Sequence, residues 1–163
     1  MNFDCGKLCG AVCCTCNNSQ GENLSDLDMG IYLYPGEEKV HPRKSTWFTW
    51  SVEDADEYDY PDSWHGKVYY IKCNTPPHCP RERRPFQCRT FPLAPYLDEE
   101  GCFSLVYSYD TLPYTCPLTE GELTIDDDFY KATFTVWTHL LRDPSIFDLV
   151  EYESEKWRNK SDG

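Results

Sequence analysis

Three short runs of β-branched and aromatic residues in the first half of the chain have the composition of strands. These runs are Ile31–Tyr34, Trp47–Trp50 and Lys67–Lys72. Pro35-Gly36 stops the first run and predicts a turn. The acidic stretch from Glu53 to Asp62 predicts a solvated loop, so the first half should consist of short strands with long connections.

A β-hairpin is predicted further along the chain. Two apolar runs, Leu93–Leu97 and Cys102–Tyr107, flank the polar sequence Asp98-Glu99-Glu100-Gly101. A short polar turn that ends in glycine between two apolar runs is typical of antiparallel strands joined directly.

The pattern changes to a helical period in the last quarter of the chain. Apolar residues recur at helical spacing at Tyr130, Phe134, Trp137 and Leu141. Asp126-Asp127-Asp128 precedes them and favours the start of a helix, where negative charge is stabilising. Asp143 can cap a second helix with Pro144 at its first position, and Ile146, Leu149 and Val150 give that helix an apolar face. We interpret the aromatic stripe as core packing rather than a ligand site.

These elements predict a small, irregular α+β domain centred on a metal site. We expect residues 1–118 to form a cysteine-cluster metal-binding domain with short strands and a β-hairpin. Residues 119–163 should form a helical segment with two helices that packs on the same domain.

Composition excludes some classes of partner. The formal net charge is −13, from 28 acidic and 15 basic side chains, which opposes binding to a phosphate backbone. The single basic run, Arg81–Arg84, is too short to reverse this balance, so we expect no nucleic-acid partner. We also expect no membrane partner, because no apolar stretch has the length of a transmembrane segment.

Ten cysteines are the outstanding feature of the composition. The first residues show neither a basic region nor an apolar run, so the sequence predicts a cytoplasmic protein rather than a secreted one. A reducing compartment keeps thiols free, and clustered free thiols in such a compartment favour metal binding over a disulfide framework.

The first cysteine cluster lies at the N-terminus. Cys5, Cys9 and Cys13 are spaced by four, so a helix would place the three thiols along one face. In a loop, Gly6 and Gly10 would let the backbone curl around an ion instead. Cys14 points elsewhere and can complete the site or reach a second one, and Cys16 follows.

The second cluster combines Cys73, Cys79 and Cys88 with four arginines. Positive charge beside a cysteine lowers its pKa and favours the thiolate that binds metal. Arg84 and Arg89 can hydrogen-bond the ligands from outside, and ion pairing with the acidic surface is an equal alternative for both. His78 is a possible mixed ligand, whereas His41, His65 and His139 stand alone.

The run from Phe3 to Cys14, followed by Arg84-Pro85-x-x-Cys88-Arg89-x-Phe91-Pro92, resembles the YkgJ-like cysteine-cluster family of zinc- or iron-chelating domains. The resemblance covers roughly residues 1–118, and it departs from the family in having three residues, rather than two, between the first cysteines. It implies metal ligation by the following cysteines: Cys5, Cys9, Cys13, Cys14, Cys73, Cys79 and Cys88. Cys16 and Cys102 match nothing in this pattern. The family is similar in its cysteine cluster to the larger flagellin lysine methylases, which keeps an iron–sulfur reading open.

Thiolate ligands exclude magnesium and calcium and leave zinc or an iron–sulfur centre. The absence of short zinc-ribbon spacing favours iron–sulfur slightly. Three functions remain open: a protein that holds, senses or delivers the metal; an iron–sulfur-dependent modifying enzyme; and an interaction module with structural zinc.

Overall fold

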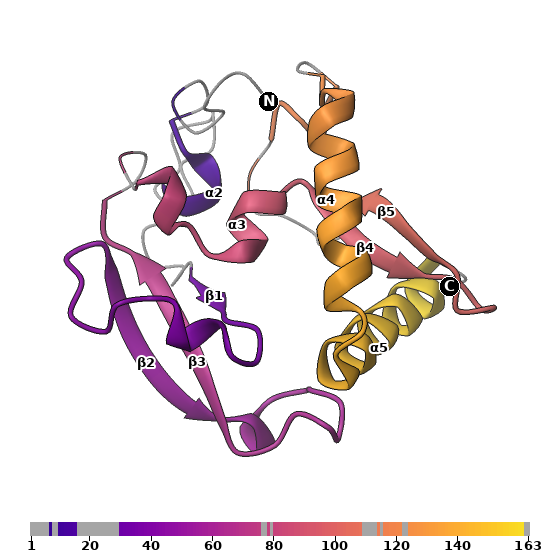
Figure 1. The fold of residues 1–163 in the computed structure, drawn as a ribbon, viewed down its shortest axis with the longest axis horizontal. Coiled ribbons are helices and arrows are strands. Elements are labelled where there is room, and N and C mark those ends of the chain that lie inside the picture. The colour runs from indigo at the N-terminus through magenta and orange to yellow at the C-terminus, as the bar shows by residue number, and fades with distance from the viewer. Residues whose placement is uncertain are drawn as a thin grey trace.

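Two antiparallel sheets and two long C-terminal helices are the main regular elements of the described chain (Figure 1). The computed structural model describes residues 7, 10–15, 30–75, 78, 80–108, 114, 116–121 and 124–161. In chain order the elements are α2 (Val12–Thr15), β1 (Ile31–Tyr32), the 3₁₀ turn η1 (Glu37–Lys39), β2 (Phe48–Asp54), η2 (Ala55–Glu57), β3 (Lys67–Cys73), η3 (Arg81–Arg83), α3 (Phe86–Thr90), β4 (Leu93–Leu97), β5 (Phe103–Tyr107), α4 (Asp127–Leu140) and α5 (Pro144–Ser161).

The first sheet has the order β1-β3-β2, with antiparallel neighbours throughout. β2 and β3 pair along their whole length, from Phe48 opposite Cys73 to Asp54 opposite Lys67. The three predicted strands are confirmed, although β1 contains only Ile31–Tyr32. The prediction of a loop beginning at Glu53 is wrong, because β2 continues to Asp54. The reason is that Glu53 is held in the strand by hydrogen bonds from side chains, including a bond of 2.5 Å from the Tyr32 hydroxyl.

The predicted β-hairpin is confirmed. β4 and β5 pair from Leu93 opposite Tyr107 to Leu97 opposite Phe103. The carboxylate of Asp98 accepts hydrogen bonds from the backbone N–H groups of Glu100 (3.1 Å) and Cys102 (2.7 Å). Cys102 therefore belongs to the turn, and β5 begins one residue later than the sequence suggests.

Both C-terminal helices begin at the aspartates that the sequence predicts. The Asp126 carboxylate accepts a hydrogen bond from Phe129 N–H at 2.7 Å and caps α4. The Asp143 carboxylate caps α5 by accepting from Ser145 N–H at 2.9 Å and Ile146 N–H at 3.3 Å.

The predicted aromatic stripe of α4 is wrong at two positions. Trp137 is 1% exposed, but Tyr130 and Phe134 are 41% and 38% exposed. The side of α4 that faces the core instead carries Thr133 and Trp137. Phe129 packs against the core cluster that contains Trp137. Tyr130 and Phe134 are one position further along the helix, which turns them towards solvent. Phe134 stacks there on Phe103 of the hairpin, with ring centroids 4.8 Å apart.

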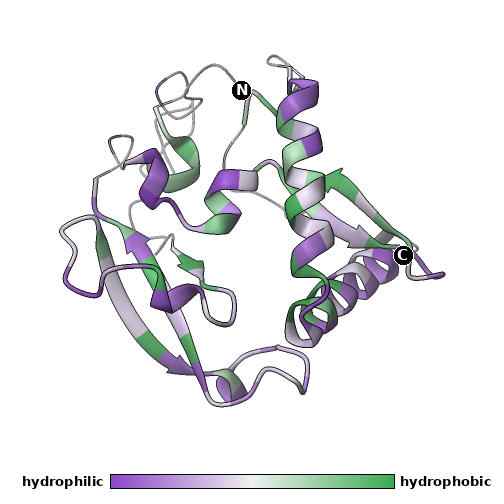
Figure 2. Cartoon of the chain, in the orientation of Figure 1, coloured by the Kyte–Doolittle hydropathy of each residue, from purple (hydrophilic) through white to green (hydrophobic). Residues whose placement is uncertain are grey.

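The largest core cluster lies between the hairpin and the two helices. It consists of Leu93, Leu97, Leu105, Trp137, Ile146 and Val150. Leu149 of α5 packs into a second cluster with residues from the first sheet and the loop beside it, Ala55, Trp64 and Val68. Figure 2 shows hydrophobic residues along β5 and at the junction of α4 with α5, and hydrophilic residues at the start of α4.

The described chain is thus a mixed fold of helices and antiparallel sheets, as expected at that level. Its organisation around a metal and the division at residue 118 stay predictions. None of the helices in the described ranges combines the length and the apolar character that crossing a bilayer requires.

Candidate metal centre

A tight backbone turn presents the first pair of cysteines. Gly10 and Ala11 both have left-handed backbone angles, with φ of 68° and 56°. This conformation is unusual for alanine, and the Ala11 side chain is 3% exposed. The backbone N–H of Cys14 donates to the Ala11 carbonyl at 2.7 Å, which closes the turn into α2. Cys13 and Cys14 follow at half-buried positions.

The sulfur atoms of this pair lie close together. The Sγ atoms of Cys13 and Cys14 are 3.9 Å apart. Two thiolates that each lie about 2.3 Å from one tetrahedral metal atom are separated by about 3.8 Å. The pair therefore already has the separation that two ligands of a single metal atom require.

Arg84 brings the second cysteine segment close to this pair. The hydrogen bond with Cys14 and burial raise the pKa of Cys13, and the positive charge of Arg84 partly opposes that rise. Arg84 follows η3 directly, and Figure 1 shows α2 beside the chain that leads through η3 into α3. The two segments that the sequence singles out thus approach each other here.

Arg89 holds the turn that carries Arg84. Its Nε donates to the Arg84 carbonyl at 2.8 Å, and its Nη2 donates to the Glu82 carbonyl at 2.5 Å. Arg89 is exposed. These bonds give it a role in shaping the segment, and the predicted hydrogen bond to a ligand stays a prediction.

Cys88 lies on the short helix α3, which is hydrogen-bonded to the segment that contains β1 and η1. The Glu37 carboxylate accepts a hydrogen bond from the backbone N–H of Phe86 at 2.7 Å. The Gln87 side-chain amide donates to the Tyr32 carbonyl at 2.8 Å. Sequence reasoning missed Glu37, whose only local signal is His41 four positions later. Cys88 itself is exposed.

Cys73 ends β3 at a half-buried position, and an unusual hydroxyl group follows it. Thr75 Oγ1 is buried and has no hydrogen-bond partner within the described ranges. The Thr75 carbonyl accepts from His78 N–H at 2.6 Å, which turns the chain after the strand. His78 is exposed. A buried hydroxyl is costly when it has no partner, which makes this group unusual within the described ranges.

Three of the seven predicted ligands, Cys5, Cys9 and Cys79, lie outside the described residues, as does Cys16. Among the residues that are described, no three or more histidine, cysteine or acidic side chains form a group that could hold a metal ion. The complete ligand set therefore stays a prediction, with Cys13, Cys14, Cys73 and Cys88 as its described members.

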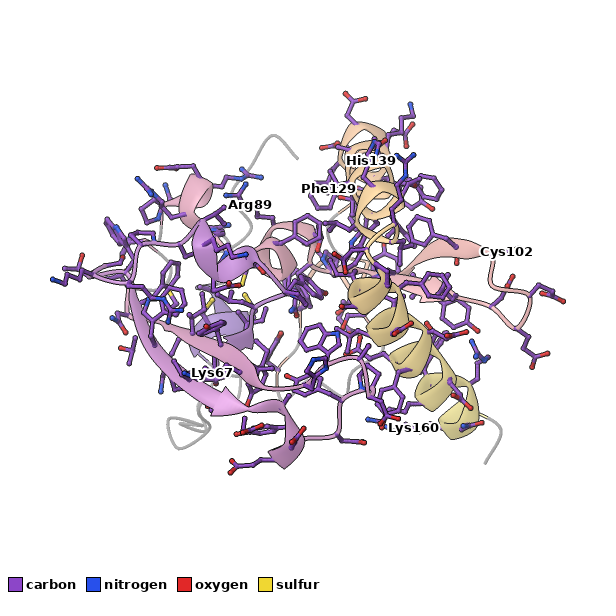
Figure 3. The ribbon with its side chains drawn as sticks, turned by 60° about the horizontal axis from the view of Figure 1, so that its bottom comes forward. Lys67, Arg89, Cys102, Phe129, His139 and Lys160 are labelled. Atoms are coloured by element: carbon purple, nitrogen blue, oxygen red, sulfur yellow. The ribbon has the colours of Figure 1, made fainter. Side chains whose placement is uncertain are left out.

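The other described cysteines and histidines have separate positions. Cys102 is exposed at the hairpin turn, and Figure 3 shows it on the far side of the molecule from Arg89. Cys116 is 5% exposed, and its carbonyl accepts from the N–H groups of Thr119 and Glu120. His41 is buried and lies 3.3 Å from the Glu37 carboxylate, while His65 and His139 are exposed.

Comparison of the chain with protein-family models, with curated proteins and with solved structures gave no match in any of the three. The resemblance to the YkgJ-like family therefore rests on the cysteine and arginine motifs themselves.

Proposed function

We propose that the chain binds a metal, as zinc or in an iron–sulfur centre, through cysteine thiolates drawn from residues 5–14 and 73–88. The observation that carries this proposal is the separation of 3.9 Å between the Sγ atoms of Cys13 and Cys14. It fits two ligands of one tetrahedral metal atom.

Two further observations support a centre shared by both segments. Arg84 lies near Cys13, so the second segment supplies positive charge beside thiols that must lose their protons to bind metal. Among the described residues, the buried hydroxyl of Thr75, two residues after Cys73, has no hydrogen-bond partner. Hydrogen bonds from such groups orient and stabilise metal-bound thiolates.

The short distance between the Cys13 and Cys14 sulfur atoms also bears on which kind of metal centre the chain can hold. A structural zinc atom binds at least two cysteines and each iron of a two-iron cluster binds two, which suits a pair 3.9 Å apart. In a four-iron cluster each cysteine binds a different iron, so Cys13 and Cys14 would not both be ligands at their present separation. The proposal therefore favours zinc or a two-iron cluster.

Metal analysis with an absorption spectrum, on protein purified without oxygen, tests the proposal. About two iron atoms and two sulfides per chain, with visible absorbance, support the two-iron cluster, whereas zinc in a colourless protein supports the zinc site. Cys13→Ser and Cys14→Ser are each expected to lower the bound metal, and Cys102→Ser serves as the matched control that retains it. Protein that stays metal-free after reconstitution with zinc and with iron and sulfide would overturn the proposal.

A further inference from the structure

A mostly buried carboxylate, that of Glu37, joins the segment 34–41 to the start of α3. The Oε1 atom of Glu37 accepts from the backbone N–H of Phe86 at 2.7 Å and lies 3.3 Å from the Nε2 atom of His41. Its Oε2 atom accepts from the backbone N–H of Tyr34 at 3.1 Å. The side chains of Glu37 and His41 are 11% and 5% exposed.

This carboxylate replaces a local cap. Pro85 precedes α3 and makes no side-chain hydrogen bond to the helix. Glu37, which is 49 positions away in the sequence, supplies the acceptor instead. A hydrogen bond to a mostly buried carboxylate is strong and directional, so it fixes where α3 begins.

The same anchoring determines where Cys88 lies. Phe86 and Gln87, the two residues before Cys88, are both fastened to the segment 32–37, through Glu37 and through the Tyr32 carbonyl. The Phe86 ring packs against Tyr34 and Trp137 as well. Cys88 follows within the same helical turn, so the Glu37 bond and the Gln87 bond set the position of the backbone that carries its thiol.

We propose that Glu37 is a positioning residue that holds the Cys88 thiol in place for metal ligation, an inference that rests on the metal-binding function proposed above. His41 holds the carboxylate in turn, and Gln87 is a second, independent anchor. Neither Glu37 nor Gln87 is a ligand.

Cobalt(II) binding to reduced, metal-free protein tests this inference. Thiolate-to-cobalt charge-transfer absorbance reports the number of thiolates bound, and competition titration reports affinity. Glu37→Ala is expected to weaken cobalt binding by about 10- to 100-fold, the range found when groups that orient ligands are removed. Glu37→Gln keeps one acceptor oxygen and should have a smaller effect, and Gln87→Met removes the other anchor. Asp143→Ala is the matched control, because it removes a helix cap from α5 and should leave cobalt binding unchanged.

A double-mutant cycle with Cys88→Ser separates positioning from general destabilisation. If Glu37 acts through Cys88, then Glu37→Gln has no further effect on affinity or absorbance once Cys88 is replaced. Equal cobalt binding by wild type, Glu37→Ala and Glu37→Gln would overturn this inference and leave the proposed function standing. An effect of Glu37→Gln that persists undiminished in the Cys88→Ser background would also overturn it. Absence of cobalt and zinc binding by the wild-type protein would overturn the proposed function and this inference together.

Discussion

The hydroxyl group of Ser154 on α5 accepts a hydrogen bond of 3.0 Å from the backbone N–H of Leu97 on β4. Ser154 is 0% exposed and donates its own proton to the Val150 carbonyl at 2.6 Å. Arg158, one helical turn further, donates to the Leu97 carbonyl at 2.5 Å. Helix α5 thus satisfies both backbone groups at the end of the strand, where the hairpin offers them no partner.

Replacing Ser154 with alanine should destabilise the protein. The change leaves the buried N–H of Leu97 without an acceptor, which costs about 1–3 kcal/mol in free energy of unfolding. Urea denaturation measures the difference. Thr138→Ala is the control, because the exposed Thr138 hydroxyl donates to the Phe134 carbonyl in the preceding turn of α4, and the change should alter stability by less than about 0.5 kcal/mol. Equal midpoints for the two variants would contradict the role of Ser154.

The two sides of α4 should respond differently to truncation. Trp137→Ala creates a cavity in the largest core cluster and is expected to cost about 3–5 kcal/mol. Tyr130→Ser removes a ring that is already 41% exposed and should cost less than about 1 kcal/mol. Thermal unfolding followed by circular dichroism compares them, with Trp137→Phe as a milder variant if the alanine variant does not fold. A larger loss from Tyr130→Ser than from Trp137→Phe would mean that the helix faces are assigned wrongly.

Acid stability should depend on Glu53. Hydrogen bonds from Tyr32, Tyr58 and Ser51 hold the pKa of Glu53 below its ordinary value of 4.5. Because the folded pKa is the lower one, ionised Glu53 contributes stability that is fully present above pH 4.5 and is lost as the pH falls through the folded pKa. The free energy of unfolding of Glu53→Gln should therefore fall less steeply below pH 4.5 than that of the wild type. Parallel pH profiles would contradict this linkage.

The described thiols should differ in reactivity. Cys102 is exposed at the hairpin turn and Cys116 is 5% exposed, so alkylation of the native protein should modify Cys102 before Cys116. Added zinc should slow the modification of Cys13 and Cys14 and leave the rate at Cys102 unchanged. Peptide mass spectrometry after timed alkylation measures each rate. Slowing of Cys102 by zinc to the same extent would place it in the metal site.

Local patterns in the sequence predict the elements but not the contacts between them. The hairpin at Asp98–Gly101 and the helix starts at Asp126 and Asp143 are correct, because turns and caps depend on neighbouring residues. The aromatic stripe is partly wrong, because helical spacing alone cannot show which of two adjacent faces meets the hairpin.

In the candidate site, too, the sequence predicts the residues but not the contacts between them. The motifs identify Cys13, Cys14 and Arg84 as candidates, and the structure brings these residues close together. No pattern predicts that Glu37 accepts from Phe86, because a cap supplied from 49 residues away leaves no local trace.

The separation in sequence between Glu37 and Phe86 also affects the order in which the parts of the chain fold. The bond to Phe86 closes a loop of 49 residues, and the bond from Gln87 to the Tyr32 carbonyl closes one of 55. Closing such loops is entropically slow compared with forming a helix or a hairpin. We therefore expect Cys88 to reach its final place after the β4–β5 hairpin and the C-terminal helices have formed. Metal capture by the complete set of thiols would accordingly mark a finished fold rather than nucleate one.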